Sequence, residues 1–202
     1  PEFVMYARRD AVFAAALEAA DLAVADGAGV VWALRRLGWP QRERVTGVDL
    51  VPELLVQCAA REEKVFLLGA EEGVAAEVGR RLQGSLPALR VVGAEAGSPA
   101  PEDDEQMVAM INQKRPDLLL VAYGHPKQEL WINRNRHRLQ VGVAIGVGGT
   151  FDVLAGRVRR APRWFQRCQL EWLWRLLLEP WRARRMAVLP RFAVAVLREE
   201  GK

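Results

Sequence analysis

The regular alternation of short apolar runs with segments of helical periodicity constrains the fold of this chain most strongly. The apolar runs, which we expect to form strands, are residues 22–25, 65–68, 90–92, 118–122 and 142–147. The segments between them, which we expect to form helices, are residues 28–37, 50–61, 72–82, 101–114 and 128–138. Several apolar runs lack alternating polar residues, as is typical of strands buried on both faces. This order predicts a Rossmann-like α/β fold, in which helices flank a parallel sheet.

The composition of the chain changes sharply around RRAPRW, residues 159–164. From Arg163 onward, nine basic residues stand against four acidic ones and give a net charge of +5, whereas the preceding residues sum to −1. Four of the seven tryptophans also lie in this tail. We therefore expect a Rossmann-like core over residues 1–162 and an Arg- and Trp-rich helical appendage over residues 163–202.

The tail combines arginine with tryptophan and leucine, which is typical of helices that lie at a membrane surface. Pro180 and Pro190 are expected to break the tail into short helices. If the helix instead continues through the first of these prolines, Arg175, Arg182 and Arg185 share one face. Two alternatives stay open, namely a helical pair that packs on the sheet and an RNA-binding tail. We expect a membrane surface, and no nucleic acid, as the partner of the tail.

The chain shows no sign of a membrane-spanning or secreted protein. No apolar stretch approaches the roughly 18 residues that a spanning helix needs, and no signal peptide is visible, although the chain begins at Pro1. Cys58 and Cys168 lie far apart and form no CxxC pair, so we expect neither a disulfide framework nor a structural zinc site. These features predict a cytoplasmic protein. The sequence does not fix the oligomeric state and leaves a homo-oligomer open.

The stretch LAVADGAGVVWAL, residues 22–34, places a carboxylate where the first expected strand leads into a helix. Two interpretations of Asp26 are open. Aspartate is a good residue for starting a helix. The carboxyl ends of strands in open α/β sheets are also where ligands bind. We count Asp26 and the following Gly27 among the candidate site residues.

Glycines follow two further expected strands. Gly69 and Gly73 lie at a strand-to-helix turn and resemble half of a dinucleotide-binding fingerprint, although simple turn chemistry explains them equally well. Gly148 and Gly149 follow the last expected strand, and glycine there permits close approach of the backbone to a ligand. Asp152 comes shortly afterwards, either as a ligand contact or as a helix cap. Gly69, Gly148, Gly149 and Asp152 are therefore candidate ligand contacts.

The stretch YGHPKQE, residues 123–129, crowds polar groups at the carboxyl end of another expected strand. Proline at its fourth position can open a helix. Glu129 suits a helix N-terminus, but Lys127 opposes the macrodipole there. The mixture indicates an anionic or hydroxyl-rich ligand, with helix capping by the acid as the alternative. The candidate contacts are Tyr123, Lys127 and Gln128.

The sequence also lacks several motifs that would define a different chemistry. No strand is followed by an Asp-x-Asp pair, so a metal-bound nucleotide sugar or triphosphate is poorly supported. There is no GxxxxGK[ST] loop, no GxSxG elbow and no Cys–His pair at an interpretable spacing. We therefore expect no metal site and no cofactor.

Taken together, six stretches resemble the WecG/TagA/CpsF family of bacterial glycosyltransferases. They run in the family's order from Pro1 to about Leu197 and are ADGAGVVWALRRLG, ERVTGVDLVPELL, VFLLGAEEGVA, YGHPKQELWI, IGVGGTFDVLAGRVRRAPRW and LEWLWRLLLEP. Any one stretch alone is weak evidence, but the combination is specific.

The resemblance implies inverting, metal-independent transfer of an N-acetylhexosamine, typically N-acetylmannosamine, from its UDP donor. The implied acceptor is N-acetylglucosamine on undecaprenyl diphosphate, in teichoic acid or surface polysaccharide synthesis. The resemblance further implies that Asp26 is the catalytic base and that Arg44 belongs to the pocket. Gln128 and Asp152 match polar positions of the family's cleft.

The resemblance also implies that Arg175, Arg182 and Arg185 lie on an appendage that touches the inner face of the cell membrane and completes the site. Family members carry a segment before the position of Pro1 that ends in a Thr-Pro-Asn motif and includes a first strand and helix. This segment is not in the sequence, which is therefore either a fragment or lacks those Thr and Asn contributions. Two other functions stay open: a dinucleotide-dependent oxidoreductase, and a non-enzymatic membrane- or RNA-binding module.

Overall fold

The computed structural model describes residues 1–40, 43–167, 170–178, 180 and 183–199. The chain forms two compact units. The helical unit comprises Pro1–Ala14, Asp21–Thr46 and Arg159–Lys202, and the sheet unit comprises Ala15–Ala20 and Gly47–Val158. This grouping differs from the expected division at residue 162, because two N-terminal segments group with the tail.

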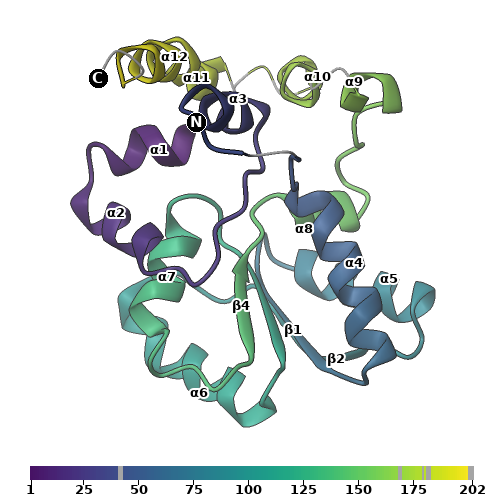
Figure 1. The fold of residues 1–202 in the computed structure, drawn as a ribbon. Coiled ribbons are helices and arrows are strands. Elements are labelled where there is room, and N and C mark those ends of the chain that lie inside the picture. Colours follow the sequence, from purple (N-terminus) through teal and green to yellow (C-terminus); the bar gives the residue numbers. More distant parts are fainter. Residues whose placement is uncertain (41–42, 168–169, 179, 181–182, 200–202) are drawn as a thin grey trace. The chain divides into compact units, whose positions relative to one another are not determined.

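The sheet unit confirms the expected Rossmann-like architecture. Within the described residues, four parallel strands form one sheet in the order β2-β1-β3-β4 (Figure 1). The strands are β1 (Lys64–Gly69), β2 (Arg90–Glu95), β3 (Leu118–Ala122) and β4 (Val143–Gly146). In register, Val65 of β1 lies opposite Leu118 of β3, which lies opposite Val143 of β4. The two central strands are almost wholly buried because helices cover both faces of the sheet.

Successive residues of β1 point to opposite faces and build two separate cores. Val65 and Leu67 enter one core, and Phe66 and Leu68 enter the other. The first core is covered by α4 (Gly47–Ala60), α5 (Val74–Ser85) and α8 (Thr150–Leu154). The second core is covered by α6 (Asp104–Lys114), which follows the short 3₁₀ helix η1 (Pro101–Asp103), and by α7 (Lys127–Asn135).

The strand order creates a topological switch point between β1 and β3. The chain leaves β1 through α5 toward β2 on one side of the sheet, and leaves β3 through α7 toward β4 on the other. The two helices pack in different cores and therefore lie on opposite faces. Open α/β sheets bind ligands in the crevice that such a reversal opens at the carboxyl ends of the strands.

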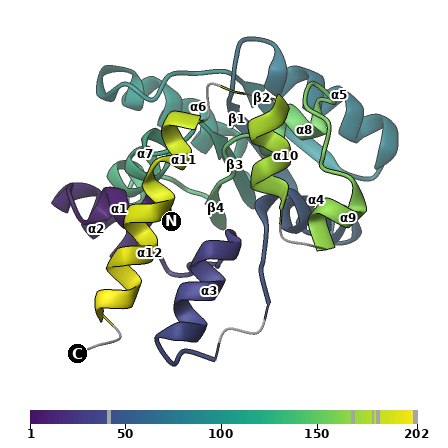
Figure 2. The same cartoon turned by 90° about the horizontal axis from the view of Figure 1, so that it is seen from above.

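In the helical unit, α1 (Glu2–Ala7) and α3 (Ala28–Arg36) pack against α12 (Val188–Glu199), the last helix that the structure describes. The unit also contains α9 (Arg163–Arg167), α10 (Glu171–Leu178) and α11 (Ala183–Met186). Figure 2 shows α12 beside α1 and α3. Phe192 and Val196 of α12 are buried against Ala33 and Met5. Next to α1, α2 (Ala11–Glu18) places the buried ring of Phe13 edge-on to two aromatic rings of the N-terminal segment.

Two local predictions are wrong. Residues 22–25 form no strand among the described residues: Leu22 is 82% exposed, and only Ala25 is buried. An apolar run becomes a strand only when it pairs with a neighbouring strand, and residues 22–25 pair with none of the four strands described. Pro190 lies in the first turn of α12 rather than breaking a helix, because an N–H is not needed there. Pro180 lies between the end of α10 and the start of α11, and its neighbours in the chain are outside the described residues. In the described part of the chain, no helix has the length and apolarity needed to span a bilayer.

Candidate active site

The carboxyl ends of β1 and β3 approach each other closely at Gly69. Its φ is +102°, and a Cβ atom there would lie 2.7 Å from the carbonyl carbon of Ala122 and 2.9 Å from the nitrogen of Tyr123. The N–H of Ala70 donates a hydrogen bond to the Ala122 carbonyl at 3.0 Å. Any side chain at Gly69 would force the two strand ends apart, so glycine is required at the switch point itself.

The side chain of Gln128 connects two of the predicted turns. It is 4% exposed, and its Oε1 accepts hydrogen bonds from the N–H of Gly124 at 3.1 Å and the N–H of Gly148 at 2.9 Å. Its Nε2 donates to Oε1 of Glu129 at 2.6 Å. Gln128 therefore lies at the carboxyl edge of the sheet, as the sequence predicted. Both the oxygen and the nitrogen of its amide form hydrogen bonds within the protein.

Tyr123 lies at the same edge and points into the second core. Its ring packs edge-on against Trp131 at a centroid distance of 5.9 Å, and a Cβ at Gly97 would lie 2.7 Å from its hydroxyl oxygen. Burial, assisted by the charges of Asp104 and Asp103, raises the pKa of the Tyr123 hydroxyl far above its usual value. The hydroxyl is therefore neutral at physiological pH. Lys127, in contrast, is exposed at the first position of α7.

The turn after β4 carries the remaining candidates of the sheet unit. Gly148 has a φ of +50°, and Gly149 is exposed and forms the N-cap of α8. Thr150, the first residue of the helix, is buried. Asp152 lies in the first turn of α8 rather than at its N-cap, so a carboxylate stands where the helix dipole favours one.

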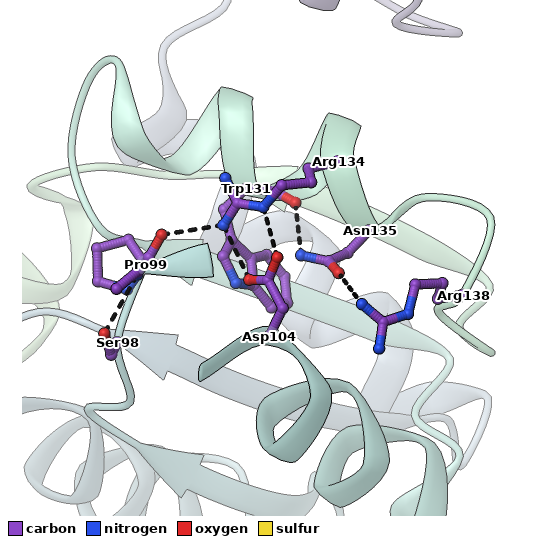
Figure 3. A network of polar contacts seen from close by, with 8 residues as sticks. Ser98, Pro99, Asp104, Trp131, Arg134, Asn135 and Arg138 are labelled. Atoms are coloured by element: carbon purple, nitrogen blue, oxygen red, sulfur yellow. Dashed lines mark hydrogen bonds and ion pairs between the residues drawn. The ribbon is translucent and has the colours of Figure 1, made fainter. Parts of the chain in front are cut away.

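A network that sequence reasoning missed fixes the loop after β2 (Figure 3). Arg134 of α7 donates to both carboxylate oxygens of Asp104, at 2.5 and 2.8 Å, and to the carbonyl of Pro99 at 3.0 Å. Asn135 donates to the carbonyl of Trp131 at 3.1 Å and accepts from Arg138. The loop and the start of α6 are thereby tied to α7.

The charge balance of this network is reflected in the pKa of Asp104. Burial, the largest single influence, raises it, but hydrogen bonds from Arg134 and Asn135 and the charges of Arg134 and Arg138 together outweigh burial. The net pKa lies below the usual range of an aspartate, and that of Arg134 is raised by the same pair. Asp104 and Arg134 lie 30 positions apart, so no local sequence pattern indicated that they form an ion pair.

Asp26, Gly27 and Arg44 lie in the helical unit. Gly27 is the N-cap of α3, so Asp26 lies one residue outside the helix, where it is exposed. The N–H of Val45 donates to the carbonyl of Ala25 at 3.1 Å, which places the segment before Asp26 beside the segment that carries Arg44. The position of Asp26 outside the N-cap weakens the interpretation of this residue as a helix cap.

Arg44 is held by Glu171, a residue that sequence reasoning did not single out. The two side chains are 15% and 21% exposed and form a hydrogen-bonded ion pair. Arg160 also contacts Glu171, with its Nε 3.4 Å from Oε1. Nε1 of Trp174 donates to the carbonyl of Arg159 at 3.4 Å. Glu171 thus orients two guanidinium groups, one from the ERVTG stretch and one from the RRAPRW stretch.

The tail arginines are described only in part. Arg175 lies in α10 and Arg185 in α11, and only their backbone is described. Arg182 and Cys168 lie outside the described residues. Cys58 is buried as a free thiol, and burial is the main cause that raises its pKa to about 11. Within the described ranges, no group of three or more His, Cys, Asp or Glu residues is placed to hold a metal ion.

The parallel sheet and the glycine turns at its switch point define a Rossmann-like α/β protein, a class that binds ligands at the carboxyl edge of the strands. Residues 1–202 match the glycosyl transferase WecG/TagA/CpsF family. The chain belongs to this family and is a glycosyltransferase, as the resemblance implied. This assignment decides against the oxidoreductase and against the non-enzymatic binding module.

Three relatives are named N-acetylglucosaminyldiphosphoundecaprenol N-acetyl-β-D-mannosaminyltransferase. The Bacillus spizizenii protein is 38% identical over 200 residues, which cover 99% of this chain and 77% of the relative. The Bacillus subtilis protein is 36% identical over 201 residues, with the same coverage. The Staphylococcus aureus protein is 34% identical over 202 residues, which cover 100% of this chain and 79% of the relative.

Proposed function

We propose that this glycosyltransferase moves an N-acetylmannosaminyl group from UDP to N-acetylglucosamine on undecaprenyl diphosphate, with inversion and without a metal ion. The proposal rests on one observation: relatives with this acceptor and this sugar in their names align with nearly the whole chain at 34–38% identity. The product then serves teichoic acid or surface polysaccharide synthesis.

The glycine turns at the switch point support binding of a UDP donor in the sheet unit. Gly73 caps α5 at a φ of +79°, and Gly124 follows β3 at +76°. A Cβ at either position would meet nothing within 4 Å, so a ligand has room to approach the backbone there. The positive end of a twelve-residue helix such as α5 favours an anion. We place the donor diphosphate at these turns, with Gly69, Tyr123, Lys127, Gly148, Gly149 and Asp152 as the surrounding candidates.

In the proposed reaction, the acceptor hydroxyl oxygen attacks the anomeric carbon while the bond from that carbon to the UDP oxygen breaks. Asp26, next to Gly27, takes the proton of the hydroxyl, and UDP leaves with the bonding electron pair. Arg44 and the tail arginines Arg175, Arg182 and Arg185 stabilise the negative charge that develops on the diphosphate. The ion pair with Glu171 supports this role, because it fixes the Arg44 guanidinium before substrate arrives.

We further propose that the tail attaches the enzyme to the cytoplasmic face of the membrane. Trp164 is 58% exposed and Leu177 64% exposed, and Trp172 is also exposed. Arg8 and Arg198 line an open hollow of about 590 Å³ between α1 and α12. Attraction of about 1 kcal/mol per basic residue near anionic lipid is enough for reversible attachment by several such residues.

Calorimetric titration tests the donor part of this proposal. The protein, kept in EDTA, is titrated separately with UDP and with NAD⁺. We expect saturable heat with UDP and none with NAD⁺. Binding of NAD⁺ in place of UDP would overturn the proposed donor.

A further inference from the structure

A carboxylate that the proposed reaction does not use lies directly behind the glycine turns. The side chain of Glu129, in the first turn of α7, is only 13% exposed. Its Oε1 accepts the hydrogen bond from Nε2 of Gln128 at 2.6 Å. Its Oε2 lies 3.6 Å from Nδ1 of His125. Burial of a carboxylate costs free energy unless the group is paired or hydrogen-bonded. The position of Glu129 at this edge of the sheet therefore needs an explanation.

The orientation of the Gln128 amide explains the carboxylate. An amide side chain has an accepting oxygen and a donating NH₂ group. Gly124 and Gly148 both present N–H donors, so only the oxygen of Gln128 can satisfy them. An amide turned over by 180° would bring its NH₂ group against two N–H groups and lose both bonds. Glu129, which only accepts when ionised, holds the NH₂ end and so excludes the turned-over orientation.

The same amide sets the spacing of two turns that belong to neighbouring strands. Gly124 follows β3 and Gly148 follows β4, and both have positive φ. A Cβ at Gly146 would lie 2.8 Å from Nε2 of Gln128, so the amide also packs flat against β4. If the Gln128 amide were turned over, both glycine turns would therefore lose their hydrogen bonds to it.

We propose that Glu129 is a positioning residue for the sugar donor: it fixes the Gln128 amide, which in turn fixes the Gly124 and Gly148 turns. This inference rests on the proposed binding of UDP at that edge. The alternative role for Glu129 is a generic one, in which any acid in the first turn of α7 stabilises the helix dipole.

A reciprocal exchange of the two side chains separates these roles. In Glu129→Ala we expect the Kd of UDP and the KM of the sugar donor to rise about tenfold, as for the loss of a hydrogen bond, with kcat changed less than threefold. In Gln128→Glu two carboxylates meet, and we expect a loss at least as large. In the double variant Gln128→Glu/Glu129→Gln, the carboxylate accepts both backbone N–H groups and the NH₂ of the new glutamine. We expect its UDP affinity to return to within about threefold of wild type.

The dipole role predicts a different pattern: Glu129→Ala should lower the free energy of unfolding but leave UDP affinity and exchange at Gly124 and Gly148 unchanged, because the orientation of the Gln128 amide would not depend on the acid. Glu129→Gln, whose amide oxygen still accepts from Gln128, is the milder variant if Glu129→Ala does not fold. Glu105→Ala, on the exposed side of α6, is the matched control and should leave UDP affinity unchanged.

Amide hydrogen exchange at Gly124 and Gly148 in the unliganded protein provides a readout that does not depend on the donor. We expect faster exchange in Glu129→Ala and in Gln128→Glu, and restored protection in the double variant. Unchanged exchange in Glu129→Ala, or a double variant no better than either single one, would overturn the positioning role. Altered exchange with unchanged UDP affinity would overturn its link to the donor. A wild-type protein that binds no UDP would contradict the proposed function instead.

Discussion

Asp26 is the residue whose replacement best separates chemistry from structure. We expect Asp26→Asn to lower kcat by about 10²–10⁴-fold, the usual contribution of a positioned general base. The Kd of UDP and the free energy of unfolding should change little, because the side chain is exposed and lies outside the N-cap at Gly27. Steady-state kinetics, calorimetry and urea unfolding of the same preparation make the comparison.

Asp21→Asn, an exposed aspartate of the same segment, is the control and should keep its turnover. A capping role for Asp26 predicts the opposite pattern, since asparagine caps a helix as well as aspartate does. Turnover close to normal in a folded Asp26→Asn enzyme would contradict the proposed base.

Glu171 is expected to matter for stability because it holds two guanidinium groups. In Glu171→Gln, Arg44 and Arg160 lose a charged partner in a setting where Arg44 is only 15% exposed. We expect the free energy of unfolding to fall by about 1.5–3 kcal/mol, the usual range for a hydrogen bond to a charged group. Urea unfolding checks this, with the exposed Glu72→Gln as control. If Glu171→Gln and Glu72→Gln were equally stable, the contacts of Glu171 with Arg44 and Arg160 would contribute nothing to the free energy of unfolding.

Three acidic residues show which parts of the candidate site a sequence can predict. Asp26 was visible because a lone carboxylate stood between an apolar run and a glycine. Glu171 was not singled out, because its partner Arg44 lies 127 positions away and neither neighbourhood shows the pairing. Glu129 was seen as an acid at a helix start, but its bond to Gln128 depends on an amide orientation that only the folded turns define.

At the scale of helices and strands, the Asp104–Arg134 pair joins α6 to α7 and should make stability depend on pH. The pKa of Asp104 is lowered in the folded state, so its contribution is complete above about pH 5 and is lost as the pH falls through the lowered pKa. We expect Asp104→Asn to be less stable than wild type at neutral pH. The difference should shrink as the pH falls below about 4.

Urea unfolding at a series of pH values measures this difference. Glu105→Gln, on the exposed side of the same helix, should give a curve parallel to that of wild type. A constant difference between Asp104→Asn and wild type from neutral to acidic pH would contradict the assigned pair.

The prediction of strands from apolar runs was correct where the run is completely buried. β3 begins and ends at the predicted residues 118–122, and all five of its residues are buried, as is typical of a central strand of a parallel sheet. Residues 22–25 look equally apolar in the sequence, but they form no strand and are mostly exposed. Apolar content indicates where a strand can form, whereas pairing depends on a neighbouring strand that the local sequence does not reveal.

For the whole molecule, membrane attachment is tested better by substitutions than by truncation at residue 162. Removal of the tail would expose the apolar faces that α12 covers on α1 and α3. We expect the triple variant Trp164→Ser/Trp172→Ser/Leu177→Ser to lose at least tenfold in binding to anionic vesicles, since each exposed apolar side chain contributes about 1.5 kcal/mol or more when buried. UDP affinity should stay unchanged.

Sedimentation with phosphatidylglycerol vesicles measures this attachment. Val56→Ser/Val143→Ser, which removes exposed apolar side chains of the sheet unit, is the control. Vesicle binding that is the same in the triple variant and in wild type would contradict the proposed role of the tail.

The division of the whole chain was only partly visible in the sequence. A change near residue 159 was expected from composition, and Arg159 does begin the last segment of the helical unit. The grouping of residues 1–14 and 21–46 with that segment was not expected. It depends on contacts such as Met5 and Ala33 with Phe192, which join positions from opposite ends of the chain.

The most direct test of the central claim is transfer itself, measured in EDTA. The protein is incubated with UDP-N-acetylmannosamine and N-acetylglucosamine linked to a polyprenyl diphosphate in anionic vesicles. UDP release and the anomeric configuration of the product are then followed. We expect one UDP released per disaccharide and a β linkage, and we expect UDP release and disaccharide formation to fall together by about 10²–10⁴-fold in Asp26→Asn. An α-linked product, or transfer that stops in EDTA and returns with Mn²⁺, would contradict the proposed function.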